Sequence, residues 1–408
     1  MSSIRKNIKI ATILPYKENY TFAKASAASL WVSEFYKNSK YNKTNHIYGH
    51  TKSKDYLTKN YFNIELSNIK SKFRSATREY INKLTKKFRH QKYDLIEIHN
   101  RPVILEELTK KIKSRYIMYF HNDPLSMNGS KTINQRLNII SNVEKIIFVS
   151  EWVQKRFFVD LDDKLKTKTE VVYPSVTNKK RLSKKKKFIT FIGKLNRSKG
   201  YDLFAKVIVR ILNEFPNWKA YSLGDEERRE IYINHKNHHE LGFLKHKDVL
   251  ELLDKTSISV VPSKWEEPFG RTALEASSRG CATIISNKGG LPETTNQAII
   301  LKNLNEETLY RQIRYLIKNK EIRKKIQKNS LKNVQHIISS NTKIIDRLRL
   351  ESLPYSNFNF IKKKIKILNI YNQGQKLNHR LYNISIGKKF SNGFIRNGHD
   401  VLEISDRD

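Results

Sequence analysis

Two carboxylates, Glu267 and Glu275, stand on either side of a Pro-Phe-Gly turn. The run before them, residues 257–262, is rich in β-branched residues and ends at proline, which is typical of a buried parallel strand. The run after the turn, residues 270–279, predicts a helix that ends at Gly280. In open α/β sheets, loops at the carboxyl ends of strands bind ligands, and helix N-termini favour anions. The two acids are therefore predicted to face one crevice. Alternatively, Glu267 only interacts with the helix dipole and Glu275 is a solvated surface acid.

A second candidate lies upstream, where a predicted strand (188–192) leads through a basic loop (193–200) into a predicted helix (201–215). Glycines bound this loop, and Lys194 and Lys199 supply its point charges. A strand, a loop with glycine and lysine, and a helix N-terminus together form a cradle for a diphosphate. Because the whole chain is rich in lysine, a plain solvated loop is the alternative.

A third loop, residues 286–293, follows the predicted strand 281–285 and contains the adjacent glycines Gly289 and Gly290. Paired glycines let the backbone approach a ligand closely, although a plain turn explains them equally well.

Taken in this order, the three loops closely resemble the motifs of glycosyltransferase family 4. They read Phe-Ile-Gly-Lys-Leu-x-x-x-Lys-Gly, then Pro-Ser-x-x-Glu-Glu-Pro-Phe-Gly-x-x-x-Leu-Glu-Ala, then Gly-Gly-Leu-Pro-Glu. The resemblance covers roughly residues 1–350 and is most specific in residues 188–293. It implies the GT-B fold, with two Rossmann-like domains facing across a cleft. It also implies that a sugar is transferred from a nucleotide donor with retention at the anomeric carbon.

Carried over to the matching positions, the resemblance implies that Glu275 holds the ribose hydroxyls of the donor. Glu267 would lie against the hydroxyls of the transferred sugar, and Lys194 and Lys199 would neutralise the departing diphosphate. Most relatives have arginine where Lys194 stands. Because arginine grips phosphate bidentately, the lysine keeps the charge but weakens the grip.

The rest of the implied donor site is rich in backbone contacts. Its residues are Gly193, Phe269, Gly270, Arg271, Gly289 and Gly290. The backbone from Phe269 to Arg271 would meet the sugar or phosphate, and the glycine pair would line the same pocket. The family mechanism is a front-face attack in which the departing phosphate deprotonates the acceptor. We therefore expect no metal site and no cofactor, with the nucleotide-sugar serving as the donor substrate.

Two histidines follow predicted strands of the first domain. His121 comes after the strand 115–120, and in relatives a histidine here lies near the donor sugar and the reacting centre. The candidate catalytic residues are therefore His121, Glu267 and Lys199, although a lone histidine is more often structural. His99 ends the strand 93–99 and could contact the acceptor or, alternatively, cap the following helix.

Strands and helices alternate along the chain, which predicts βαβ units and parallel sheets. Predicted strands of the first domain are 8–14, 93–99, 115–120, 145–149 and 170–173, with helices at 22–36 and 103–112. The predicted divisions are a Rossmann-like acceptor-side domain (1–177), a basic linker (178–187), a Rossmann-like nucleotide-sugar-binding domain with closing helices (188–350), and an extension (351–408). The fold class is α/β, of the GT-B type with a short C-terminal βαβ extension. A nuclear-localisation or RNA-binding tract is the alternative for the linker lysines.

The extension contains a predicted strand (362–371), a helix (385–396) and a second strand (400–404). This order resembles the opening βαβ of another GT-B domain and echoes residues 5–10. A partial parallel unit of this size would bury little surface on its own. The extension is interpreted as the start of a second, truncated transferase, or alternatively as an accessory unit docked on the main body.

The chain has 408 residues, of which 38% are hydrophobic, so each domain has enough apolar residues for a core. No apolar run approaches the ~18 residues of a membrane span, and the N-terminus lacks a signal-peptide pattern, so the protein is expected in the cytoplasm. The single Cys281 reads as a small buried residue.

The net charge of +40 could favour peripheral contact with an anionic membrane surface, or it could be compositional background spread along the chain. Residues 69–88 form a basic candidate helix, for which core packing with a wet face is favoured over membrane binding.

The expected function is a retaining glycosyltransferase that acts on a hydroxyl of a glycan or lipid-linked acceptor, in cell-surface polysaccharide or lipopolysaccharide synthesis. The segment 15–27 departs from the family because alanine and serine replace its usual glycine-rich turn. Epimerases and phosphorylases share this fold, so fold alone does not fix the chemistry. The chain could also be a non-catalytic GT-B scaffold or a basic nucleic-acid-binding protein. Because the aromatic and glycine signatures of nucleic-acid-binding modules are lacking, no specific nucleic acid is expected.

Overall fold

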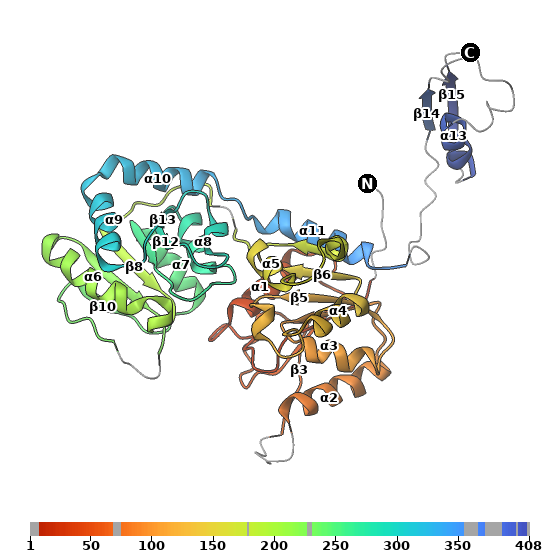
Figure 1. Cartoon of the computed structure of the whole chain (residues 1–408), viewed down its shortest axis with the longest axis horizontal. Helices are drawn as coiled ribbons and strands as arrows, with labels where there is room; N and C mark the ends of the chain where they lie inside the picture. The colour runs from red at the N-terminus through yellow and green to blue at the C-terminus, as the bar shows by residue number, and fades with distance from the viewer. Residues whose placement is uncertain are drawn as a thin grey trace. The chain divides into compact units, whose positions relative to one another are not determined.

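The computed structural model describes residues 8–67, 75–177, 179–226, 231–354, 366–371, 386–396 and 399–405 (Figure 1). The chain divides into a body, Asn7–Leu353, and a small C-terminal unit that begins at Pro354. The body contains two α/β domains, each built around a parallel sheet.

The first domain is built on seven strands within the described residues, all parallel, in the order β3-β2-β1-β4-β5-β6-β7. They are β1 (Ile10–Ile13), β2 (Asn45–Gly49), β3 (Tyr61–Asn63), β4 (Leu95–His99), β5 (Arg115–Phe120), β6 (Lys145–Phe148) and β7 (Thr169–Val171). The central strands are buried on both faces, as expected for a parallel sheet covered by helices. Strands β2 and β3 were not among the predicted strands.

Helices connect these strands. They are α1 (Ala27–Asn38), α2 (Ala76–His90), α3 (Pro102–Thr109), α4 (Ile133–Asn142) and α5 (Glu151–Phe157), with 3-10 turns η1 (Pro124–Ser126) and η2 (Asp163–Lys168). Helix α2 corresponds to the predicted basic helix. It buries Tyr80, Ile81, Leu84 and Phe88 in the core while its lysines face outward, so the core-packed interpretation is confirmed.

The second domain carries six parallel strands within the described residues, in the order β10-β9-β8-β11-β12-β13. They are β8 (Phe188–Ile192), β9 (Lys219–Leu223), β10 (His238–Glu240), β11 (Ile258–Val261), β12 (Ala282–Ser286) and β13 (Ile299–Leu301). The helices are α6 (Tyr201–Glu214), α7 (His246–Lys255), α8 (Arg271–Ser278), α9 (Glu306–Lys318) and α10 (Lys320–Lys332), with 3-10 turns η3 (Arg197–Lys199) and η4 (Leu291–Thr294). The two sheets confirm the predicted α/β class with two Rossmann-like domains.

The last helix of the body, α11 (Ile338–Glu351), returns to the first domain and packs against α1 (Figure 1). Just before it, Val176 pairs with Ile337 in a short parallel bridge. The chain therefore crosses between the domains twice, once between β7 and β8 and once before α11.

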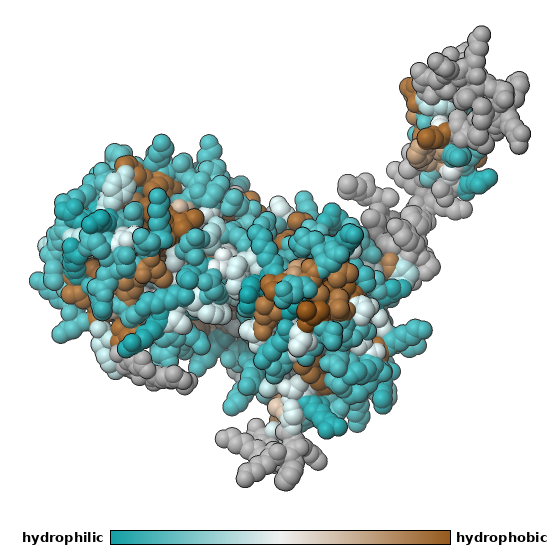
Figure 2. All heavy atoms as spheres, viewed as in Figure 1, coloured by the Kyte–Doolittle hydropathy of each residue, from teal (hydrophilic) through white to brown (hydrophobic). Residues whose placement is uncertain are grey.

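The C-terminal unit contains two parallel strands, β14 (Lys366–Tyr371) and β15 (Asp400–Ser405), joined through α13 (Ile386–Arg396). Its strand–helix–strand order and its parallel pairing are those of β1, α1 and β2 at the start of the first domain. Leu368, Ile370 and Leu402 are exposed on its sheet, and apolar residues of this unit are brown in Figure 2. The predicted βαβ extension is thus present in the described residues; residues 362–365 and 385 lie outside them.

Among the described residues, no helix is both long and apolar enough to cross a membrane.

Candidate functional site

A cavity of about 370 Å³ lies between the two domains of the body. The first domain contributes the segment before and at the start of α1 and the ends of β4 and β5. The second domain contributes the loops after β8 and β11 and the first residues of α8. The cavity therefore lies at the carboxyl ends of both sheets, where open parallel sheets bind ligands. Lining residues among those predicted are His121, Gly193, Lys199, Glu267, Phe269, Gly270 and Arg271.

Lys199 and Glu267 form the polar centre of the second-domain wall. Nζ of Lys199 lies 2.7 Å from Oε1 of Glu267 and 4.6 Å from the centre of the Trp265 ring. Lys199 comes from η3, which leads into α6, and Glu267 comes from the loop after β11. Gly200 allows these segments to meet, because it has φ +73° and a Cβ there would lie 1.9 Å from the carbonyl oxygen of Pro262. The acid and the cation predicted from separate motifs thus form one site.

Glu275 is held by two donors inside the second domain. Nε of Arg271 donates to its Oε1 at 2.6 Å, and Nε2 of His246 lies 2.8 Å from the same oxygen. Burial alone would raise the pKa of Glu275, but Arg271 and His246 together lower it to about 2. Among the described residues, none donates a hydrogen bond to Oε2, so a carboxylate oxygen remains for a ligand hydroxyl. Glu275 itself lies next to the residues that line the cavity and is not one of them.

Arg271 also reaches across to the first domain. Its NH1 and NH2 donate to the Glu34 carboxylate of α1 at 2.9 and 2.5 Å. Glu34 was not predicted, because it lies 237 residues from Arg271 and nothing in its local sequence marks it. Gly270, with φ +101°, begins the turn that places Arg271 at the start of α8.

The adjacent glycines Gly289 and Gly290 pack against the acid loop, the loop of residues 262–270 that carries Glu267. They are not among the residues that line the cavity. A Cβ at Gly289 would lie 2.1 Å from the carbonyl oxygen of Glu267, and one at Gly290 would lie 2.5 Å from that of Pro268. The backbone N–H of Gly290 donates to Glu267 O at 2.7 Å. Close approach was predicted here, and it occurs, but the neighbour is the protein's own backbone instead of a ligand.

Gly193 and Lys194 take different positions although they are adjacent. Gly193 lines the cavity with φ +151°, and a Cβ there would point into open space. Lys194 is exposed and does not line the cavity. In this structure Lys199, and not Lys194, supplies the cation of the cavity wall.

His121 lines the cavity from the first domain. Its Nε2 lies 2.8 Å from Nδ1 of His99, its backbone N–H donates to Oδ1 of Asn100 at 2.8 Å, and the Trp31 ring stands edge-on at 5.2 Å. Burial lowers the pKa of His121 to about 3, so the ring is neutral at pH 7. His99 is only 1% exposed and pairs with His121, so neither acceptor contact nor helix capping describes its place.

Hydrogen bonds join the acid loop and η4 of the second domain to the start of α5 in the first domain. Oγ of Ser150 donates to Pro268 O at 2.5 Å, and the backbone N–H groups of Glu151 and Trp152 donate to the Glu293 carboxylate at 2.7 and 2.9 Å. The Ser-Glu-Trp sequence thus begins α5 and holds the second domain at the same time. Glu293 was part of a predicted loop, but its partner helix could not be known from the sequence.

The segment 15–27, where a glycine-rich turn was missing, still reaches the cavity through Glu18, Ser26 and Ala27. Ser26 caps α1 by accepting from the backbone N–H of Ser29 at 3.1 Å. This segment therefore lines the cavity although it contains no glycine. Within the described residues, no three His, Cys, Asp or Glu side chains are arranged to hold a metal ion.

Comparison with known proteins shows similarity to glycosyltransferases in sequence and in fold. Residues 174–333 match the family described as glycosyl transferases group 1. Spore coat protein SA of Bacillus subtilis (strain 168) is 24% identical over 281 residues, which are 60% of this chain and 74% of that protein.

Two solved structures have the same fold. Alr3699/HepE of Anabaena in complex with UDP and glucose has a TM-score of 0.68 at 17% identity, over 85% of this chain and 100% of its own. The lipopolysaccharide outer core galactosyltransferase WaaB, in its apo form, has a TM-score of 0.61 at 14% identity, also over 85% of this chain and 100% of its own. The predicted GT-B fold is confirmed, whereas the assignment to family 4 stays a prediction. Residues 174–333 are therefore similar to the glycosyl transferases group 1 family, and the body of the chain has the GT-B fold.

Proposed function

We propose that this protein is a metal-independent retaining glycosyltransferase of family 4 that moves a hexose from a nucleoside-diphosphate sugar to a hydroxyl of a glycan or lipid-linked acceptor. The observation that carries the proposal is the 2.7 Å pair of Lys199 and Glu267 in a cavity that His121 enters from the opposite domain. A cation, a carboxylate and a neutral imidazole face one space between two Rossmann-like domains.

The donor would lie along the second-domain wall. The ribose hydroxyls would donate to Oε2 of Glu275, and the diphosphate would lie near Lys199 and the open space above Gly193. Lys199 then stabilises the charge that grows on the leaving diphosphate. Glu267 accepts hydrogen bonds from the sugar hydroxyls. The phosphate oxygen takes the acceptor proton, so the protein mainly positions groups and balances charge.

A smaller hollow of about 290 Å³ is a candidate for the base. Gly224, Glu240, Gly242 and Phe243 are among the residues that line it. Which base binds is the first question for experiment.

The relatives support the class of substrate. HepE holds UDP and glucose in its complex, and WaaB is described as a galactosyltransferase of the lipopolysaccharide outer core. We therefore propose a role in cell-surface polysaccharide or lipopolysaccharide synthesis. The reaction would take place in the cytoplasm, with peripheral contact to an anionic membrane as the way to reach a lipid-linked acceptor.

The decisive experiment is nucleotide release from UDP-, GDP- and ADP-sugars by the full chain, with and without EDTA. The expected result is turnover of one donor that EDTA does not reduce, and a product that NMR shows to keep the donor's anomeric configuration. Inversion, or turnover that EDTA abolishes, would contradict the retaining, metal-independent reaction. Binding of a nucleoside diphosphate without turnover of any donor would instead favour a non-catalytic scaffold.

A further inference from the structure

A row of polar side chains crosses one face of the first-domain sheet and ends at the cavity. The row consists of Thr12 on β1, Glu97 and His99 on β4, Tyr119 on β5 and His121 just after β5. Thr12 pairs in register with Glu97, and His99 pairs with Tyr119. Residues two apart on a strand share a face, so Glu97 with His99, and Tyr119 with His121, point the same way.

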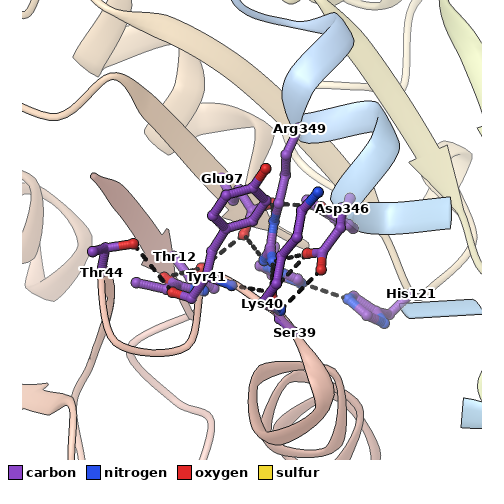
Figure 3. Close-up of polar contacts among 12 residues, drawn as sticks. Thr12, Ser39, Lys40, Tyr41, Thr44, Glu97, His121, Asp346 and Arg349 are labelled. Carbon is purple, nitrogen blue, oxygen red and sulfur yellow. Dashed lines mark hydrogen bonds and ion pairs between the residues drawn. The ribbon is translucent and has the colours of Figure 1, made fainter. Parts of the chain in front are cut away.

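The deep end of the row is a fully paired ion cluster (Figure 3). NH2 and Nε of Arg349 each donate to the Glu97 carboxylate at 2.8 Å, and Thr12 and Tyr119 donate to it at 2.8 and 2.7 Å. Burial would raise the pKa of Glu97, yet Arg349 and the hydroxyl donors lower it. Arg349 belongs to α11, the helix that returns to this domain, and also contacts Asp346 and Ser39.

The other end of the row controls the ring of His121. The Tyr119 ring stacks on His99 with centroids 4.3 Å apart and 9° between planes. His99 in turn places Nδ1 at 2.8 Å from Nε2 of His121. Trp31 packs edge-on against all three rings at 5.2 to 5.6 Å. Each ring thus has neighbours on several sides and little freedom to turn.

This arrangement leaves one ring nitrogen of His121 for a ligand. Nε2 is engaged by His99, and none of the described residues forms a hydrogen bond with Nδ1. Two neutral imidazoles share one hydrogen between the paired nitrogens. If His99 donates, the hydrogen of His121 is on Nδ1, which then donates to a ligand; if His99 accepts, Nδ1 is an acceptor. The tautomer of His99 therefore decides what His121 offers to the cavity.

We propose that His99 and Tyr119 are positioning residues that fix the ring orientation and the tautomer of His121. Arg349 supports them by holding the Glu97 carboxylate, to which the Tyr119 hydroxyl donates. The proposal rests on the proposed transferase function, in which His121 faces the cavity that would hold the donor. Packing alone does not account for the row, since apolar residues would fill the same space without the cost of burying Glu97 and Arg349. Helix α11 thereby supports the site through Arg349, although it is far from the site residues of the first domain in sequence.

The test compares His99→Phe, which keeps a flat ring against Tyr119 but removes the hydrogen bond, with His99→Asn, whose amide can still donate or accept near Nδ1. For the donor that is turned over, we expect His99→Phe to lower kcat about tenfold and His99→Asn to lose less. The affinity for the nucleoside diphosphate and the unfolding midpoint should stay close to those of the unmodified protein, because the second domain holds the nucleotide. Equal losses in kcat, nucleotide affinity and unfolding midpoint would show a merely structural role and overturn the proposal.

A second readout does not depend on turnover. In protein labelled with ¹⁵N-histidine, we expect His121 to show a single neutral tautomer that His99→Phe converts to the other tautomer or to a mixture. An unchanged His121 spectrum in His99→Phe would overturn the proposal even if no donor is turned over. Failure of the transferase reaction and failure of the positioning role are therefore distinguishable. Arg349→Met is a further variant, but its loss of a buried ion pair can unfold the domain, so His99 decides the question.

Discussion

Arg271 and Glu34 join the two domains of the body through a bidentate ion pair, with NH1 and NH2 of Arg271 at 2.9 and 2.5 Å from the carboxylate of Glu34. The same guanidinium donates through Nε to Glu275. One side chain therefore connects the helix of the first domain that begins at the cavity with the acid proposed to hold the donor ribose. The contact between the two domains and the position of Glu275 therefore depend on the same guanidinium.

The Glu34→Gln variant tests this coupling. A neutral amide accepts only one hydrogen bond from the guanidinium of Arg271. Glu275 then remains as the single carboxylate paired with the Arg271 charge among the described residues. We expect a loss of about 1–3 kcal/mol in the free energy of unfolding, since both partners are largely buried. We also expect an increase in KM for the donor, because Arg271 is no longer held in one place. Thermal denaturation and initial-rate kinetics measure the two effects.

Glu107→Gln is the matched control for that variant. Glu107 is an exposed acid that pairs with Lys110 and Lys111 on the surface of the first domain. Surface pairs of this kind contribute less than about 1 kcal/mol. If Glu34→Gln is no more destabilising than Glu107→Gln and leaves KM unchanged, the ion pair does not link the domains in the way described.

The Glu275→Gln variant tests the ribose contact. The amide can keep Arg271 and His246 on its oxygen, but it then presents an NH₂ group where ribose hydroxyls need an acceptor. Hydrogen bonds to a charged acceptor are the stronger ones, so we expect nucleoside diphosphate affinity to fall about 10- to 100-fold. Calorimetric titration with UDP, GDP and ADP measures the change, with Glu251→Gln on the exposed face of α7 as control. Affinity that matches the control would show that Glu275 is a structural acid.

Some residues with a signal in their own loop line the cavity, although their roles stay predictions. Lys199, Glu267 and Gly193 lie at the cavity because glycine, lysine and acid positions after short strands define loops at the carboxyl ends of a parallel sheet. It failed where a role depends on what faces a loop. Gly289 and Gly290 had the composition for close approach, but the approaching backbone is that of the acid loop.

The remaining features lacked a local sequence signal. Strands β2 and β3 are short and polar in part, with Tyr61–Asn63 only three residues long, so no alternation marked them. Glu34 pairs with Arg271, and Glu97 pairs with Arg349, each across more than 230 residues of sequence. Only the folded chain brings these partners together. The echo between residues 5–10 and the extension was visible in the sequence, and in the described residues β14, α13 and β15 follow the same parallel strand–helix–strand order as β1, α1 and β2.

Lys199 and Lys194 give a direct comparison of two lysines in one loop. Lys199 lies in the cavity wall 2.7 Å from Glu267, whereas Lys194 is exposed and is not among the lining residues. If Lys199 stabilises the leaving diphosphate, we expect Lys199→Ala to lower kcat about 100-fold. Lys194→Ala should change kcat no more than about threefold, because a charge in solvent is screened. Equal effects of the two variants would mean that the loop acts as a general basic surface.

Stability should depend on pH through four histidines whose pKa is lowered by burial or partial burial. Burial lowers the pKa of His99, His121, His238 and His336, that of His121 to about 3 and that of His238 to about 4. In the unfolded chain these groups bind a proton near pH 6.5, so below that pH the unfolded state holds more protons than the native state. The free energy of unfolding is therefore not reduced by these groups above about pH 6.5, and it decreases as the pH falls from there toward 3.

We therefore expect the unfolding midpoint to fall between pH 7 and pH 5.5, by the equivalent of about 1 kcal/mol for each histidine that stays neutral in the native state. The His121→Gln variant should show a smaller fall over the same range. Glu293, whose pKa burial raises, acts in the opposite direction but at lower pH, near the range of carboxyl groups. A midpoint that is the same at pH 7 and pH 5.5 would contradict burial of neutral histidines.

The Gly290→Ala variant tests whether packing behind the acid loop sets the position of Glu267. Gly290 has φ −83°, which alanine adopts without strain, so the effect comes from space alone. A Cβ there would lie 2.5 Å from Pro268 O and 2.9 Å from Oγ of Ser150, the two atoms that form the hydrogen bond holding the loop against α5.

The methyl group must therefore push the acid loop away from Ser150, which moves Glu267 relative to Lys199. We expect the free energy of unfolding to fall by about 1–3 kcal/mol, which leaves the variant folded at 25 °C. We also expect kcat to fall at that temperature, and because the variant is folded, the fall reports the displaced Glu267 and not unfolding. Gly393→Ala is the control, because a Cβ there meets nothing within 4 Å and its helix lies outside the body. Wild-type kcat in Gly290→Ala, together with an unchanged unfolding midpoint, would mean that the loop carrying Glu267 adjusts freely and that the glycine pair does not position the acid.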